Sequence, residues 1–247
     1  GPVAGGDSGG NTTINAKGTV KELLAFDTLD IPQNGTLIVT QKIKHNESYA
    51  AARGTIAFHG GSMLITQGTD KNNLSAGTFV VNGTGNLLKS KKNAYLTLYG
   101  GPVTGGGKLQ LGPYADGSAA APGDTLLSFS SADSANTSDY VLGFNQSAWT
   151  PYKNGGKIII AENVIKVTHR PPSGSPTATM FPTLADAFRH VKADDQPGEY
   201  TVEATKAYNS TTVPWYNANE DKAALLDMTP LKALKVTIGT ARPASTP

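Results

Sequence analysis

The sequence predicts a mainly β protein, most simply an irregular parallel β-solenoid (alternatively an elongated β-sandwich), followed by a small α+β segment. Between residues 28 and 111, a Gly or Asn and then a Thr or Lys repeatedly precede three to five residues rich in Ile, Leu, Val or Phe. Short β-branched runs separated by turn residues are typical of strands. Three Gly-Thr starts fall at residues 35, 54 and 77, in steps of 19 and 23 residues. A loose period of this size is typical of solenoid coils.

The composition narrows the class of protein. The 247 residues can bury a core without staples, and there is no cysteine, which fits a bacterial exported protein. Lys and Arg number 21 against 19 Asp and Glu, and Lys89, Lys91 and Lys92 form the densest basic cluster. Such a triplet is typical of a solvated turn, so no nucleic-acid partner is predicted. No apolar run approaches the roughly 18 residues of a membrane helix, so no membrane insertion is predicted in this segment.

Composition also suggests domain boundaries. Residues 1–18 are Gly, Ser, Thr and Asn rich and predict a flexible leader, and residues 19–26 predict either a short helical turn or a first strand that caps the array. Residues 19–169 form the β-rich repeat-like domain, with a long loop near 112–123. Its later strands are expected at 125–129, 140–144, 157–160 and 164–168. Four prolines in residues 170–182 predict an extended linker.

Residues 183–247 change character and predict the small α+β segment. Leu184, Ala187, Phe188 and Val191 lie at helical spacing behind Thr183, a candidate N-cap. Asp186 stands three residues after that cap, as in a capping box. Strands are expected at 199–205 and 234–238, and a short helical turn at 221–228.

Three strings in this segment carry a resemblance. Thr-Leu-Ala-Asp-Ala-Phe from residue 183, Gly-Glu-Tyr-Thr-Val from 198 and Leu-Lys-Val-Thr-Ile-Gly from 234 resemble the entry coil of right-handed parallel β-helix proteins. That group includes bacterial surface and autotransporter-passenger-type adhesins and pectate-lyase-like enzymes. The likeness spans residues 183–239, with looser coils over 35–111. It implies that residues 183–247 are the entry coil of a further β-helix and that the chain is a fragment of a longer protein.

The resemblance also implies a function and a location. We expect a non-enzymatic adhesin or structural segment, extracellular or on a bacterial cell surface, whose partner is a glycan or protein on another surface. A carbohydrate-active enzyme, either a polysaccharide lyase or a hydrolase, is the first alternative. A viral or phage capsid or fibre protein is the second. An acid cluster on adjacent coils would favour the enzyme, and a trimer would favour the fibre.

Aromatic residues are the candidate ligand-binding positions, because sugar C–H faces stack on rings and Tyr and Trp anchor protein interfaces. The alternative interpretation is that Trp149 closes a core and Trp215 caps a coil. The candidates are Trp215, Tyr216, Trp149, Tyr152, Tyr95 and Tyr99.

No catalytic residue, metal or cofactor is predicted. Ser8 lies in a Gly-Asp-Ser-Gly-Gly string like that of trypsin-like proteases, but only five residues precede the string, too few to hold the His and Asp that the chemistry needs. The four histidines are scattered, at 45, 59, 169 and 190, without metal-site spacing. Acid clusters are expected in turns or at strand ends, with no acid on the strands of the array; they comprise Asp27 and Asp30, Asp133 and Asp139, and Asp194, Asp195 and Glu199.

Asn-x-Ser/Thr sequons are frequent, and we interpret them first as β-turns leading into strands and second as glycosylation sites of a secreted protein. They begin at Asn11, Asn34, Asn46, Asn73, Asn82, Asn136, Asn145 and Asn209.

Overall fold

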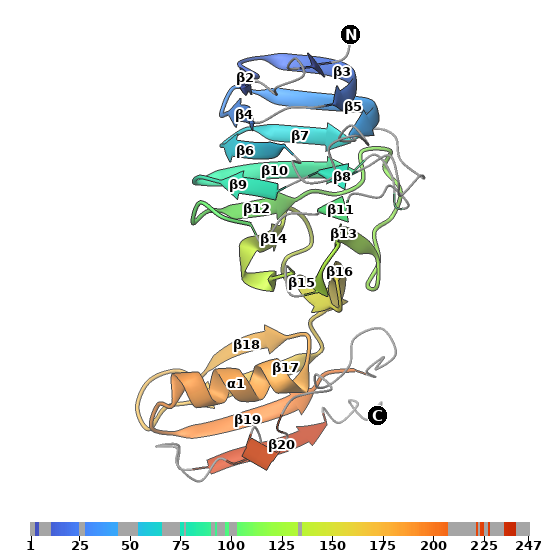
Figure 1. Cartoon of the computed structure of the whole chain (residues 1–247). Helices are drawn as coiled ribbons and strands as arrows, with labels where there is room; N and C mark the ends of the chain where they lie inside the picture. The colour runs from blue at the N-terminus through green and yellow to red at the C-terminus, as the bar shows by residue number, and fades with distance from the viewer. Residues whose placement is uncertain are drawn as a thin grey trace. The chain divides into compact units, whose positions relative to one another are not determined.

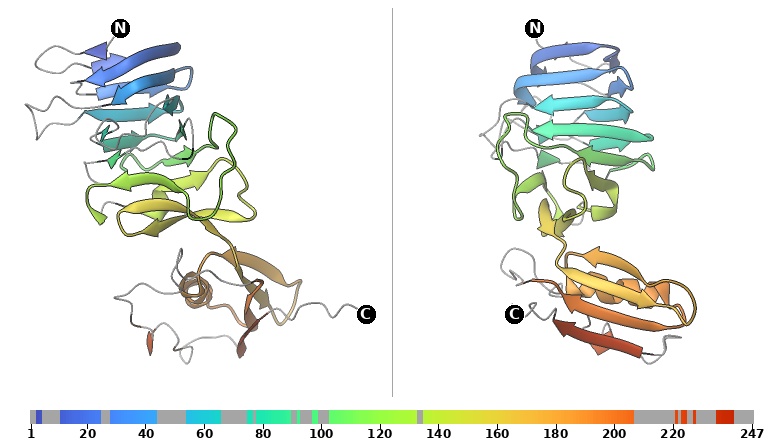
Figure 2. Two further views of the ribbon diagram at one scale, coloured as in Figure 1. Left: turned by 90° about the vertical axis from the view of Figure 1, so that its right-hand side faces the viewer. Right: turned by 180° about the vertical axis from the view of Figure 1, so that it is seen from behind.

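A computed structural model shows two compact units, each described by itself (Figures 1 and 2). The first holds residues 1–146 and 151–160, and the second holds 147–150 and 161–247. The structure describes residues 3–4, 11–24, 28–43, 54–65, 75–76, 78–89, 92, 97–98, 103–132, 135–206, 221, 223–224, 227 and 235–240. No helix in these ranges is long and apolar enough to cross a membrane.

The first unit is built on a seven-stranded sheet, here called sheet A, in which every neighbouring pair is parallel. Figure 1 shows its strands stacked one below the next. In spatial order they are β1 (Val3–Ala4), β3 (Lys17–Leu24), β5 (Thr36–Ile43), β7 (Ser62–Ile65), β10 (Thr84–Lys89), β12 (Lys108–Leu111) and β14 (Tyr140–Leu142).

A second parallel sheet, sheet B, supplies another side of the coils up to β10, and the chain there passes alternately between sheets A and B, apart from the short strand β8. Its order is β2 (Asn11–Thr13), β4 (Thr28–Pro32), β6 (Thr55–His59) and β9 (Thr78–Val81). Each of β4, β6 and β9 is followed after a short turn by β5, β7 or β10 of sheet A. The predicted parallel solenoid is therefore confirmed.

A further sheet, sheet C, lies mostly in the first unit and departs from the coil pattern at β16. Its order is β15 (Trp149–Asn154), β16 (Lys157–Glu162), β13 (Thr125–Phe129), β11 (Thr97–Leu98) and β8 (Ser75–Ala76). β8, β11 and β13 are parallel, whereas β16 runs antiparallel to β13. The sequence did not predict β15, because Pro151 and the polar Lys153 and Asn154 weaken its strand pattern.

The core is a set of columns that run from coil to coil. On sheet A the register aligns inward residues of five successive strands, each 2% exposed or less; they are Leu37, Met63, Leu87, Leu111 and Leu142. On sheet B, Phe58 and Phe79 are fully buried and meet edge to face, with ring centroids 5.5 Å apart. Because side chains alternate between faces along a strand, residues of equivalent register from each coil face one continuous apolar interior.

One corner between sheets B and A requires glycine. A Cβ built on Gly61 would lie 2.4 Å from Cγ2 and 2.5 Å from the carbonyl oxygen of Ile31 on the preceding coil. Gly61 also donates its backbone N–H to that carbonyl, at 3.2 Å. The coils approach here too closely for any side chain.

The second unit is a four-stranded mixed sheet, sheet D, covered on one face by a helix. Its order is β18 (Thr177–Phe181), β17 (Ile165–Arg170), β19 (Glu199–Ala204) and β20 (Lys235–Thr240). Only β19 and β20 are parallel. Helix α1 (Leu184–Asp194) contacts β17, β18 and β19 and buries Ala187, Phe188 and Val191 against Val167 and Val202.

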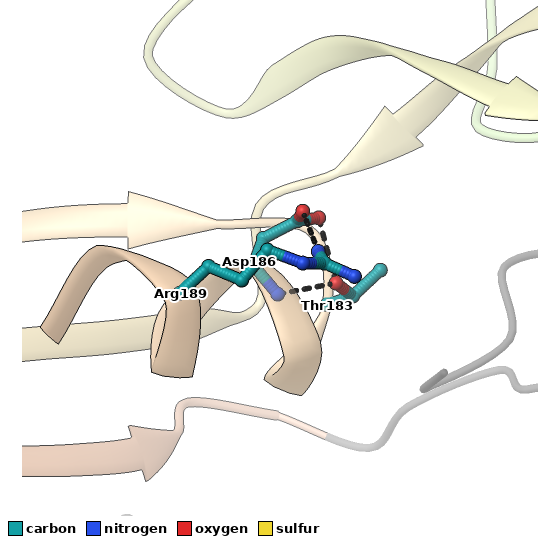
Figure 3. Close-up of polar contacts among 3 residues, drawn as sticks. All are labelled: Thr183, Asp186 and Arg189. Atoms are coloured by element: carbon teal, nitrogen blue, oxygen red, sulfur yellow. Dashed lines mark hydrogen bonds and ion pairs between the residues drawn. The ribbon is translucent and has the colours of Figure 1, made fainter. Parts of the chain in front are cut away.

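The start of α1 confirms the predicted cap (Figure 3). The hydroxyl of Thr183 accepts the backbone N–H of Asp186 at 3.0 Å and donates to its carboxylate at 2.6 Å. Arg189 contacts the other carboxylate oxygen at 2.8 Å. Aspartate is shorter than the glutamate of a capping box, so it reaches the Thr183 hydroxyl rather than the cap's own N–H.

Several predicted boundaries differ from the structure. The predicted linker at 170–182 contains β18, which pairs with β17 along five residues, because Thr177, Thr179 and Phe181 suit a strand and no proline falls between 177 and 181. The predicted leader, residues 1–18, contains β2 and the start of β3. Of the two alternatives at 19–26, the strand is correct as far as residue 24.

Candidate functional site

Of the six aromatic candidates, the structure describes two. Trp149 and Tyr152 both lie on β15 and are half-buried, and each interacts with neighbouring groups. Residues three apart on a strand point to opposite faces, so these two rings do not form one stacking platform. Trp215, Tyr216, Tyr95 and Tyr99 lie outside the described residues.

The structure brings together a different set, a polar row that crosses three coils of sheet B. Asp30 lies in the middle of β4, His59 ends β6, and Asn82 follows β9. The Nε2 of His59 lies 3.4 Å from Oδ1 of Asp30. Its Nδ1 lies 3.4 Å from Nδ2 of Asn82. These three residues are called the sheet B row below.

The contacts of His59 indicate how its ring is used. An amide nitrogen only donates, so Asn82 donates a hydrogen bond to Nδ1 of His59. The N–H of the ring is then on Nε2 and faces the carboxylate of Asp30. This arrangement satisfies both contacts. The side chains of His59 and Asp30 are 42% and 34% exposed, so the row faces solvent. It can donate to and accept from a polar ligand.

The row borders a regular hydroxyl column on the same sheet. Thr28, Thr55 and Thr78 are aligned on successive strands at outward, half-buried positions. Neighbouring strands are about 4.8 Å apart, so these hydroxyls repeat at that spacing. Together with the sheet B row they form the polar face of sheet B, in which the register also places the apolar Ala57 and Val80 beside Asp30.

The placement of Asp30 corrects the expectation that acids avoid the strands of the array. Asp30 is the third of the five residues of β4. An outward strand position is solvated, so a carboxylate there pays little desolvation free energy. One signal could have found the row: His59 and Asn82 are 23 residues apart, the same step as Thr55 to Thr78.

A second polar cluster lies inside the first unit, around Asp124. Its Oδ2 accepts the hydroxyl of Tyr114 at 2.9 Å and the N–H of Ala121 at 3.0 Å. Its Oδ1 lies 2.8 Å from Nζ of Lys92. Burial, and then the bond to Asp124, raise the pKa of Tyr114 far above its usual range, so the phenol stays protonated. The cluster holds the long loop that precedes β13.

A third cluster closes the end of α1 onto sheet D. The hydroxyl of Tyr200 donates to Oδ2 of Asp194 at 2.5 Å and accepts the N–H of Gln196 at 3.0 Å. Burial, followed by this bond to Asp194, raises the pKa of Tyr200 to about 12. His169 stacks on the Tyr200 ring with centroids 4.4 Å apart. Since Tyr200 is fully buried, this cluster supports the fold rather than a solvent-facing site.

The structure does not bring the remaining predicted serine, histidine and aspartate residues together in one site. Ser8, His45, Asp27 and Asp133 lie outside the described residues. Asp139 directly precedes β14. Burial raises the pKa of its carboxyl group, and nearby Lys108 only partly opposes this rise. His190 packs against Phe181 with centroids 4.8 Å apart. Within the described ranges, no group of three or more His, Asp or Glu could hold a metal ion.

Comparisons with protein-family models, with curated proteins and with solved structures find no match to this chain.

Proposed function

We propose that this chain is a non-enzymatic segment of a bacterial cell-surface or secreted protein, acting as an adhesin or structural stalk that binds glycans or proteins on another surface. The observation that supports it most is the unbroken parallel ladder of sheet A. From β3 to β14, six strands pair in parallel, with one register shift between β3 and β5, and at about 4.8 Å per strand they extend the sheet over roughly 24 Å. A stacked array offers a repeating outer surface supported by backbone hydrogen bonds.

The polar face of sheet B favours a glycan or a polar protein surface as the partner. Its hydroxyl, amide, imidazole and carboxylate groups stand on successive strands, and rigid strands hold them in place without a cost in loop ordering. The hydrolase form of the enzyme alternative usually requires two carboxyl groups within about 5–9.5 Å of each other across a substrate. In the sheet B row, the carboxylate of Asp30 faces an imidazole instead.

The test measures binding and turnover together on the full chain. Immobilised protein is exposed to arrays of polysaccharides and of extracellular-matrix proteins, and the same ligands are incubated in solution and examined for new reducing ends or unsaturated sugars. We expect binding without product. Product release that depends on Asp30 would replace the adhesin proposal with the enzyme.

Variants then locate the binding face. His59→Ala should weaken binding about tenfold or more, because it removes the centre of the sheet B row. Thr36→Ala, an outward and half-buried position on sheet A, is the matched control and should bind as the wild type does. Equal binding by both variants would exclude the sheet B face.

Light scattering tests the fibre alternative. A monomer agrees with the proposal, whereas a stable trimer would favour a viral or phage fibre, in which intertwined chains bury strand edges in one another.

A further inference from the structure

Asp124 is the only charged side chain that is buried among the residues the structure describes. Its side chain is 5% exposed. The backbone around it is fixed: its carbonyl accepts the N–H of Ile160 at 3.0 Å, and its own N–H reaches the carbonyl of Ala121 at 3.1 Å. A carboxylate held this firmly out of water is costly unless each oxygen has a partner.

The two oxygens of this carboxylate have different surroundings. Oδ2 receives two hydrogen bonds, from the Tyr114 hydroxyl and from the Ala121 N–H. Oδ1 faces the amine of Lys92 at 2.8 Å, and the Lys92 side chain is 49% exposed. The amine nitrogen therefore stands beside the carboxyl carbon, and two donors point at the oxygen on the other side.

The geometry points to a covalent cross-link, an amide bond between Nζ of Lys92 and Cγ of Asp124. Proton transfer within the ion pair first gives a neutral amine and a neutral carboxylic acid. The nitrogen lone pair then attacks Cγ, and the electron pair of the carbonyl moves onto Oδ2. When the carbonyl re-forms, Oδ1 leaves as water and takes a second proton from the nitrogen. One ammonium and one carboxylate thus become one amide and one water, without an oxidant or reductant.

The surroundings supply what this condensation needs. The Tyr114 hydroxyl and the Ala121 N–H are placed as an oxyanion hole for the charge that develops on Oδ2. Tyr114 keeps its proton because burial raises its pKa. The fixed contact between the Lys92 amine and the Asp124 carboxyl group replaces a bimolecular encounter. Because the Lys92 side chain is half exposed, its amine can exchange protons with water.

The link would join two successive coils. Lys92 precedes β11 and Asp124 precedes β13, and these strands are neighbours in sheet C. An amide here would prevent the two coils from separating under load. The inference goes beyond the proposed function and does not depend on it.

Intact mass spectrometry of the purified full chain tests the inference, followed by peptide mapping. We expect a mass one water below that calculated from the sequence, and a branched tryptic peptide that contains both Lys92 and Asp124. Lys92→Arg is the matched control: it keeps the charge pair but carries no nucleophilic amine, so its mass should show no loss of water. Tyr114→Phe should slow formation by roughly 100-fold, because it removes one oxyanion donor.

Two outcomes would overturn the inference. A wild-type mass equal to that of the sequence would make the contact an ordinary ion pair. A water loss that maps to Asp116-Gly117, where an aspartate can dehydrate onto the following N–H, would assign the mass change to a different reaction.

Discussion

Two buried tyrosines, one in each unit, should respond in opposite directions to loss of the hydroxyl group. The hydroxyl of Tyr140 on β14 is buried and has no hydrogen-bond partner among the described residues, although its ring packs against Phe129. The hydroxyl of Tyr200 on β19 has two partners, Asp194 and Gln196. The substitutions to compare are Tyr140→Phe and Tyr200→Phe.

The expected magnitudes follow from these contacts. Tyr200→Phe removes one hydrogen bond to a carboxylate, typically about 1.5–3 kcal/mol, and leaves the Gln196 N–H without that partner. We expect it to lower the free energy of unfolding of the second unit by about 3 kcal/mol. Tyr140→Phe keeps the ring and removes a desolvated hydroxyl whose burial costs about 1–3 kcal/mol. It should leave the first unit unchanged or about 1 kcal/mol more stable.

Urea unfolding of the full chain measures both effects. Circular dichroism follows the transitions, and amide hydrogen exchange assigns each one to the unit that contains β14 or β19. The unfolding slope should stay constant in both variants, because neither changes the surface exposed on unfolding. A loss above about 1 kcal/mol in Tyr140→Phe would show that its hydroxyl is bonded after all, and a neutral Tyr200→Phe would refute the role of the Asp194 bond.

Three further predictions concern the corner, the cap and alkaline pH. Gly61→Ala should destabilise the first unit by about 3 kcal/mol or more in urea unfolding because its Cβ meets Ile31, whereas in Gly18→Ala the nearest atom lies 3.8 Å away and the change should be under about 1 kcal/mol. Thr183→Ala should cost the second unit about 1 kcal/mol, and Thr183→Ser, which keeps the hydroxyl, should cost less than half of that; equal losses would exclude the cap. The raised pKa of Tyr200 means that the unfolded chain ionises first, near pH 10, so stability is complete below pH 10 and falls as the pH approaches about 12. In a pH series of urea unfolding midpoints, Tyr200→Phe should lose less stability between pH 10 and about 12 than the wild type does.

Local patterns were enough to predict most elements of the fold. Gly-Thr starts followed by β-branched runs identify β5, β6 and β9, because a turn residue and a strand former need only their own neighbours to act. The same holds for α1, whose apolar spacing and N-cap lie within twelve residues. The buried run of β16 was also predicted, since Ile158, Ile159 and Ile160 leave no polar face.

Elements that depend on a distant partner were missed. β15 contains a proline, and β18 contains small polar residues and lies between prolines. Both are strands because they pair with a neighbouring strand, β15 with β16 and β18 with β17. The expected linker thus became part of a sheet. Composition describes a segment alone, whereas strand pairing is a property of two segments.

The candidate site was likewise predictable only in its local features. The sequence by itself determined the coil period, the turn chemistry and the inventory of polar side chains. Only the tertiary structure decided that Asp30, His59 and Asn82 share one face, and that Lys92 meets Asp124 across 32 residues. The physical reason is that pairing of parallel strands places residues about one coil apart in the sequence side by side on neighbouring strands. A shift by one residue would turn every outward side chain of a coil into its core.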